Sequence, residues 1–197
     1  MSVRHFTRFA DLPQSPTPPF QSLTEFGALW EYVEHVIDPR FVVEIGSLYG
    51  GTLWYWLQLS DAAVASVDLV PPEPIRTDVL AARALWPSWS PRLSIIEGDS
   101  HDPQTSAAVT RQRNIDLLFI DGDHTYGGVR ADFDLWSPLV RPGGLIAFHD
   151  TVVNGTRDEP GVRRLCEELK HQWGVLSVEF FDPDGAGITA FVLPLSS

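Results

Sequence analysis

Acidic residues mark the ends of five short apolar segments in this chain. A carboxylate stands at or near the end of each segment: Glu44, Asp68, Asp99, Asp121 and Asp150. In an open parallel sheet, ligands bind beyond the carboxyl ends of the strands. If the five segments are strands of one parallel sheet, these carboxylates are placed where a small molecule would bind.

The strongest chemical signal is the pair of segments that contain Asp121 with His124 and His149 with Asp150. If the two segments end neighbouring strands, the carboxylates of Asp121 and Asp150 can converge. They then suit a hard divalent cation such as Mg²⁺, with His149 completing a softer site for Mn²⁺. His124 is the candidate general base because it stands in the cleft. In the alternative interpretation, His124 caps the next helix and His149 fills the core.

A glycine-rich turn, EIGSLYGGT at 44–52, follows the first apolar segment. Its glycines, Gly46, Gly50 and Gly51, permit a tight turn and a close approach of the backbone to a ligand. The helix that follows Thr52 directs its N-terminus at such a ligand and favours a carboxylate there. The G-x-x-x-G-G spacing differs from the dinucleotide pattern G-x-G-x-x-G. A turn that only joins a strand to a helix has the same pattern.

Two further acids fit the recognition of a nucleoside. Asp68 comes 22 residues after Gly46, and an acid at the second strand end can accept hydrogen bonds from both ribose hydroxyls. Asp99, in the segment EGDS, would lie beside the base. Each acid has a structural alternative as a helix cap or a loop residue.

The elements that must position these residues alternate regularly along the chain. Continuously apolar segments predict parallel strands buried on both faces, at 41–45, 63–68, 93–99, 115–121 and 144–150. Helical patterns separate or follow them near 52–60, 76–86, 103–112, 126–137 and 161–172. The segments 176–181 and 188–193 are joined by the turn sequence DPDGAG, which predicts a hairpin. We therefore expect an α/β fold with a mostly parallel seven-stranded sheet, a C-terminal β-hairpin and helices on both faces.

The 197 residues fit one such domain, preceded by an arm and a helix within residues 1–40. Residues 13–20 are rich in proline, and a helix is predicted over 24–37 with Thr24 as its cap. We expect this region to cover the cleft or to contact a second subunit in a homo-oligomer. A net charge of −12 disfavours nucleic acid and anionic membranes as partners. Without a signal-peptide pattern or a long apolar run, a cytoplasmic location is expected.

The motifs EIGSLYGGT, SVDLV, EGDS and FIDGDHTYGGVRADFDLWSPLVRPGGLIAFHD together resemble the class I S-adenosylmethionine-dependent methyltransferases. More narrowly, they resemble the group that includes the macrocin O-methyltransferases and the cephalosporin-hydroxylase-like proteins. The resemblance covers residues 41–150, and the terminal hairpin agrees with it. It implies a Rossmann-like domain over 41–197 that binds S-adenosylmethionine and methylates a hydroxyl of a small molecule.

The resemblance also implies roles for individual residues. The turn would hold the methionine part of the cofactor, with Asp68 on the ribose and Asp99 and Ser100 beside the adenine. The full set expected to bind the cofactor is Glu44, Gly46, Ser47, Gly50, Gly51, Thr52, Asp68, Asp99, Ser100 and Asp121. Catalytic roles are expected for Asp121, His124 and His149. Asp121 and Asp150 match positions that hold Mg²⁺ in relatives, with His149 where metal-using relatives often have an acid.

Three rival functions remain open on the sequence. The first is a methyltransferase that needs no metal and uses His124 or His149 alone. The second is a non-catalytic protein that keeps the fold and binds a nucleoside. The third, a nicotinamide oxidoreductase, is disfavoured by the glycine spacing and by the terminal hairpin.

Overall fold

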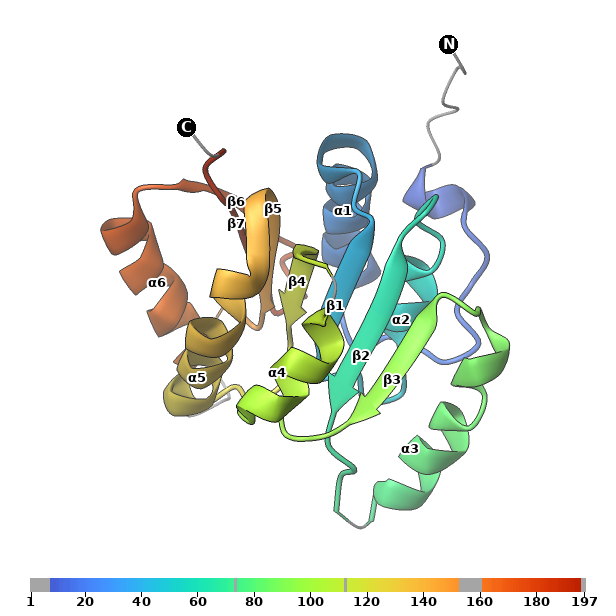
Figure 1. Cartoon of the computed structure of the whole chain (residues 1–197). Helices are drawn as coiled ribbons and strands as arrows, with labels where there is room; N and C mark the ends of the chain where they lie inside the picture. The colour runs from blue at the N-terminus through green and yellow to red at the C-terminus, as the bar shows by residue number, and fades with distance from the viewer. Residues whose placement is uncertain (1–7, 73, 112, 153–160, 196–197) are drawn as a thin grey trace.

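The structure, a computed structural model, describes residues 8–72, 74–111, 113–152 and 161–195 (Figure 1). One seven-stranded sheet, in the order β3-β2-β1-β4-β5-β7-β6, forms its centre. The strands are β1 Phe41–Ile45, β2 Ala63–Asp68, β3 Leu93–Glu97, β4 Ile115–Ile120, β5 Val140–His149, β6 Leu176–Phe180 and β7 Ile188–Val192. Strands β1 to β5 are parallel, and β7 runs antiparallel to both β5 and β6. The predicted parallel sheet with a terminal hairpin is confirmed.

Within the described residues, six α-helices connect or precede these strands: α1 Leu23–Tyr32, α2 Gly51–Trp56, α3 Arg76–Arg83, α4 Pro103–Thr110, α5 Tyr126–Trp136 and α6 Gly161–Trp173. Short 3-10 helices lie at Phe9–Asp11, Trp86–Ser88 and Ser137–Leu139. None of the helices in the described ranges is long and apolar enough to span a membrane.

The sheet has an apolar core on each face because successive side chains of a strand point to opposite sides. Along β4, Leu117 and Phe119 pack with α1 and α2, whereas Leu118 and Ile120 pack with α5 and α6. All six residues of β4 are buried. Figure 1 shows the two groups of helices on opposite sides of the sheet. Burial on both faces explains why β1, β2 and β4 are continuously apolar in the sequence. The prediction was wrong for β3, which lies at the edge of the sheet and whose residues are exposed or half-buried.

The N-terminal helix begins one residue earlier than the sequence indicates. Its cap is Ser22, whose hydroxyl accepts from the backbone N–H of Thr24 at 3.2 Å, so the assignment of Thr24 as the cap was wrong. After Tyr32 the chain continues as a π-helical turn over Val33–Ile37. This wider turn changes the angular spacing of side chains, and Val36 consequently points outward with 61% of its surface exposed.

Candidate active site

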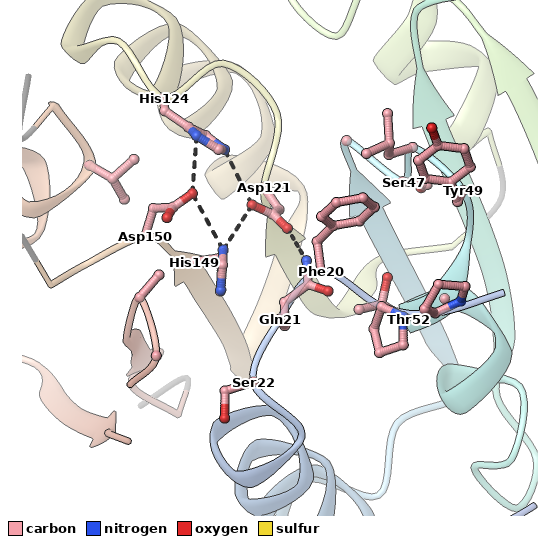
Figure 2. A pocket seen from close by; sticks show the side chains of 18 of the residues that line it. Phe20, Gln21, Ser22, Ser47, Tyr49, Thr52, Asp121, His124, His149 and Asp150 are labelled. Carbon is pink, nitrogen blue, oxygen red and sulfur yellow. Dashed lines mark hydrogen bonds and ion pairs between the residues drawn. The ribbon is translucent and has the colours of Figure 1, made fainter. Parts of the chain in front are cut away.

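A cavity of about 780 Å³ lies at the carboxyl ends of β1, β4 and β5. Its walls come from the turn after β1, the ends of β4 and β5, the segment 18–22 before α1, and the hairpin turn 184–186, with Val162 of α6. Figure 2 shows side chains from the first three around the same space. The location agrees with the expectation that ligands of a parallel sheet bind beyond its carboxyl edge.

Two carboxylates and two imidazoles meet in this cavity and form what we call the Asp–His cluster: Asp121, His124, His149 and Asp150. His124 Nε2 lies 3.3 Å from Asp121 Oδ1, and His124 Nδ1 lies 3.0 Å from Asp150 Oδ2. His149 Nδ1 lies 3.2 Å from Asp121 Oδ1 and 3.4 Å from Asp150 Oδ2. Each imidazole therefore bridges both carboxylates.

The main chain places these groups by strand adjacency and by one unusual backbone conformation. β4 and β5 are neighbours in register, with Ile120 opposite Phe148, so Asp121 and His149 leave the sheet side by side. Asp150 has a φ of 59°, in the left-handed region. Non-glycine residues adopt this conformation at a cost and are often functional when they do. The left-handed backbone at Asp150 directs its carboxylate toward Asp121.

Each of the four groups in the cluster shifts the pKa of its neighbours. Hydrogen bonds to the two carboxylates raise the pKa of His124 to about 10. Burial lowers the pKa of His149, but the two aspartates outweigh this effect and raise it to about 10. Burial likewise raises the pKa of Asp121 and Asp150, but the histidines reverse that effect and hold both below their ordinary values. The cluster is thus two carboxylates balanced by two imidazolium groups at neutral pH.

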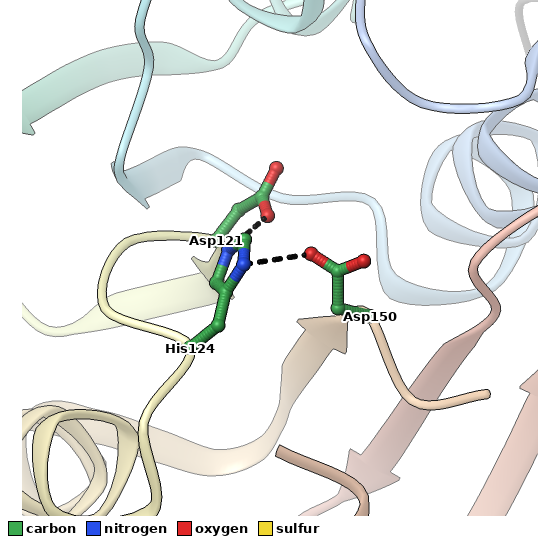
Figure 3. A group of neighbouring side chains, drawn as sticks. All are labelled: Asp121, His124 and Asp150. Atoms are coloured by element: carbon green, nitrogen blue, oxygen red, sulfur yellow. Dashed lines mark hydrogen bonds and ion pairs between the residues drawn. The ribbon is translucent and has the colours of Figure 1, made fainter. Parts of the chain in front are cut away.

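The donor set also fits a divalent cation. Asp121, His124 and Asp150 each offer one ligand atom, and the three atoms lie within 4.8 Å of one another (Figure 3). The sequence instead placed His149 with the two carboxylates. In the structure, His149 Nε2 is buried and has no hydrogen-bond partner among the described residues. Two carboxylates with one imidazole suit Mn²⁺ or Fe²⁺ as well as Mg²⁺.

The glycine turn is held by close backbone packing. Gly46 has a φ of 83°, and a Cβ added there would lie 2.2 Å from the carbonyl oxygen of Asp121. Gly50 also has a positive φ, and its missing Cβ faces the ring of Trp86 at 2.5 Å. The missing Cβ of Gly51 faces the backbone of Pro19 at 2.3 Å. The turn therefore touches β4, the segment after α3 and the N-terminal arm. Gly46, Gly51 and the predicted cofactor residues Ser47 and Thr52 line the cavity.

Asp68, predicted to bind ribose, forms hydrogen bonds with the backbone of the glycine turn. Its Oδ2 accepts from the backbone N–H of Ser47 at 2.9 Å and from that of Leu48 at 2.7 Å. The same oxygen accepts from Arg83 Nη2 at 2.7 Å. Burial raises the pKa of Asp68, while Arg83 and the two amides oppose that rise. The sequence analysis missed Arg83, which lies 15 residues further on in a helix with no motif.

Gly50 and Asp68 do not line the cavity, and three further predicted cofactor residues also lie outside its wall. Asp99 is exposed and accepts from the backbone N–H of His101 at 2.9 Å. The carbonyl of Ser100 accepts from Trp136 Nε1 at 2.8 Å. Glu44 is fully buried, and it accepts from Thr52 Oγ1 at 2.7 Å and from Trp56 Nε1 at 2.6 Å. Glu44 thus ties the start of α2 to β1.

Glu44 gives a testable pH dependence of stability. Burial raises its pKa from 4.5 to about 8. Between these values the folded protein holds a proton that the unfolded chain has lost, so stability falls as pH rises, by up to about 1.4 kcal/mol per pH unit. In Glu44→Gln, the carbonyl can accept from Trp56 while the amide donates to the Thr52 hydroxyl. We expect this variant to show a flatter dependence.

Urea unfolding at pH 5, 6, 7 and 8 measures the effect as a difference between variant and wild type. Glu97→Gln, at an exposed residue ending β3, is the control and should follow wild type at every pH. A constant difference between Glu44→Gln and wild type across this range would contradict the raised pKa of Glu44.

The sequence predicted the Asp–His cluster and an N-terminal region that covers the cleft or contacts a second subunit, but it did not predict that the hairpin turn lines the cavity. The segment 18–22 contributes Phe20, Gln21 and Ser22, and the hairpin turn contributes Asp184 and Gly185. The prolines at 13–20 indicated an extended arm, but their spacing does not show which residues of the arm contact the cavity. The sequence also predicts that the loop 151–160 lies at the rim of the cavity; Val152 lines it, and 153–160 lie outside the described residues.

Comparison with known proteins agrees with this geometry. Residues 43–151, more than half of the chain, match the family described as "Methyltransferase domain". The chain is 28% identical over 152 residues to protein y4gI of Sinorhizobium fredii, covering 68% of this chain and 16% of that protein. It is also 28% identical over 146 residues to a Mycobacterium avium protein with a provisional O-methyltransferase name, covering 70% and 60%. The chain thus spans less than two thirds of the length of either relative.

A solved structure shares the fold at lower identity. The O-methyltransferase from Bacillus cereus, determined in complex with SAH, superposes with a TM-score of 0.65 at 22% identity, covering 93% of this chain and 85% of that chain. The region that matches the family, residues 43–151, contains most of β1 with its glycine turn, β4, and β5 with the Asp–His cluster. The Rossmann-like sheet, its terminal hairpin and the family match together establish that this chain belongs to the methyltransferase-domain family.

Proposed function

We propose that the protein transfers the methyl group of S-adenosylmethionine to a hydroxyl oxygen of a small molecule, with help from a divalent cation. The observation that carries the proposal is the convergence of the Asp–His cluster and the glycine turn on one cavity of about 780 Å³. The names of the M. avium and B. cereus proteins, both O-methyltransferases, support oxygen as the acceptor atom.

The chain's own residues have two tasks in this reaction. S-adenosylmethionine, when bound, supplies a methyl group already activated by its sulfonium. The turn and the cluster must hold the acceptor oxygen in line with the methyl carbon and sulfur. As the new C–O bond forms, the C–S bonding electrons pass to sulfur, and the hydroxyl proton must leave the acceptor. The Asp–His cluster is the part of the cavity able to receive that proton.

The cation would be held by Asp121, His124 and Asp150. Bound there, it supplies Lewis acidity that lowers the pKa of the acceptor hydroxyl. Its positive charge would also oppose the protonation of His124, which leaves the imidazole free to serve as ligand or base. A vicinal diol or a catechol would chelate the cation through both oxygens, and we propose acceptors of this kind.

A second candidate is methyl transfer without a metal. It is favoured by the bridging position of His124, at 3.3 Å from Asp121 and 3.0 Å from Asp150. The two imidazoles balance both carboxylates, so no cation is needed to relieve their repulsion. A protonated imidazole cannot accept a second proton, so this mechanism requires His124 to lose its proton before it takes the one from the acceptor hydroxyl.

Ligand binding tests the proposed cofactor. We expect S-adenosylhomocysteine to bind and to stabilise the fold, by about 2.7 kcal/mol at one hundred times its Kd. NAD is expected to leave the thermal unfolding unchanged. Calorimetric titration and thermal unfolding measure both effects. Absence of binding by S-adenosylhomocysteine, or binding of NAD in its place, would overturn the proposal.

Asp68→Ala should weaken binding of S-adenosylhomocysteine by about tenfold, since charge-assisted hydrogen bonds contribute more than 1 kcal/mol. The variant releases the amides of Ser47 and Leu48, which then no longer hold the turn in place. Asp61→Ala is the matched control because Asp61 forms an exposed ion pair with Arg40, and such pairs contribute little. Equal affinities in both variants would contradict a role for Asp68 in the site.

A further inference from the structure

The segment before α1 lies directly on the glycine turn. The Cβ that Gly51 lacks would stand 2.3 Å from the nitrogen and 2.5 Å from the Cα of Pro19. Real Cβ atoms do not approach backbone so closely, so only glycine at position 51 leaves space for this segment. We call residues 18–22 the strap. Its contact with the turn is made through main-chain atoms, which cannot adjust as a flexible side chain can.

Two further contacts, at residues that follow Pro19, also fix the strap. The Phe20 ring stacks on Tyr49 of the turn, with centroids 5.6 Å apart and planes inclined by 18°. The Ser22 hydroxyl donates to Asp182 Oδ2, in the hairpin turn, at 2.6 Å. The strap therefore spans the cavity from the turn after β1 to the turn between β6 and β7.

Between these anchors, Gln21 reaches the Asp–His cluster. Its side-chain amide donates to Asp121 Oδ2 (Figure 2). The other oxygen of the same carboxylate, Oδ1, faces both His124 and His149. The Asp121 side chain is only 9% exposed, so the rotation of its carboxylate is decided by these three partners. Gln21 is the partner that the N-terminal region supplies.

We propose that Gln21 is a positioning residue: it fixes Asp121 Oδ2 and thereby directs Oδ1 toward the two histidines. The inference rests on the proposed function for its catalytic meaning, but the geometry it asserts can be measured without turnover. A carboxylate free to rotate would share its two oxygens among the imidazoles and solvent. A fixed one keeps the proton-accepting groups and the ligand atoms in one arrangement.

The test follows the imidazole nitrogens of His124 and His149 by NMR in protein labelled with ¹⁵N-histidine, at one fixed pH. Gln21→Met keeps the length of the side chain and removes the amide. We expect the ring nitrogens of both histidines to shift in this variant, while those of His101 and His171 do not. Gln14→Met is the matched control, because Gln14 is exposed on the same arm. It should leave all these resonances in place.

A second variant should disturb the contact between Gln21 and Asp121 without changing either residue. Gly51→Ala does not touch Asp121, but its Cβ would displace Pro19 and lift the strap. The same ring nitrogens should shift as in Gln21→Met. Unchanged His124 and His149 resonances in a folded Gln21→Met protein would overturn the proposal. The proposed function is tested separately by titration of wild type with S-adenosylhomocysteine: failure there, with the ring shifts present, refutes the function and leaves the positioning intact.

Discussion

Asp121→Asn and Asp150→Asn should each lower methyl transfer by about 100-fold or more, the effect typical of removing one group that stabilises charge in a transition state. Each change keeps the shape of the side chain and removes one negative charge. Without a cation, two imidazolium groups then face a single carboxylate; with a cation bound, the cation loses one of its ligands. The measurement is transfer of labelled methyl from S-adenosylmethionine to a catechol or another vicinal diol.

Binding of S-adenosylhomocysteine separates this loss from a damaged fold. Both variants should largely retain it, because Asp121 is one of ten residues expected to bind the cofactor and the contacts expected of the turn do not depend on the charge of the cluster. Asp134→Asn is the matched control: Asp134 lies on the surface of α5, paired with Arg130, and its loss should leave turnover unchanged. Asp150 has a more exposed side chain than Asp121, so its variant is the less disruptive of the two.

Chelation then distinguishes the two mechanisms. With a bound cation, wild-type activity falls in EDTA and returns with Mg²⁺ or Mn²⁺. Full activity in EDTA, with both Asn variants inactive, would favour the metal-free candidate in which His124 and the aspartates handle the proton alone. Full activity in EDTA with both variants active would refute a role for the cluster in either mechanism.

The fold followed from the sequence because each strand carries its own signal. The predicted segments 41–45 and 63–68 coincide with β1 and β2, since continuous burial on both faces makes their limits visible. β5 was expected to begin at 144 but begins at Val140. Arg141-Pro142-Gly143 resembles a turn, but here it continues the strand, where the register with β4 shifts after Ile115.

The site followed from the sequence only where strand adjacency decides it. Asp121 and Asp150 converge because β4 and β5 are neighbours, which the order of elements indicates. Glu44 is different: it shares a face with Val42 and so points into the core beside α2, as strict alternation along β1 would have shown. Arg83 and Gln21 come from segments without a motif. Their contacts depend on how a helix and an arm pack against the sheet, and such packing produces no periodic pattern in the sequence.

Gly46→Ala is expected to have the largest effect on stability. The added Cβ would lie 2.2 Å from the carbonyl oxygen of Asp121 and 2.6 Å from the Cα of Gly122. Both contacts are with backbone, so the turns after β1 and β4 would have to separate. A left-handed conformation adds about 1–2 kcal/mol for a residue with a side chain, and overpacking adds about 1–3 kcal/mol. We expect the free energy of unfolding to fall by about 3 kcal/mol, measured by urea denaturation.

The same substitution at another glycine should have the opposite sign. Gly127 lies in α5, and a Cβ added there meets no atom within 4 Å. Gly127→Ala should therefore stabilise the protein, by about 0.5 kcal/mol, because alanine loses less conformational entropy in a helix. If Gly46→Ala were as stable as Gly127→Ala, the two turns would not be in contact. Asp121 would then owe its place in the cavity to something other than the close approach of β1 and β4.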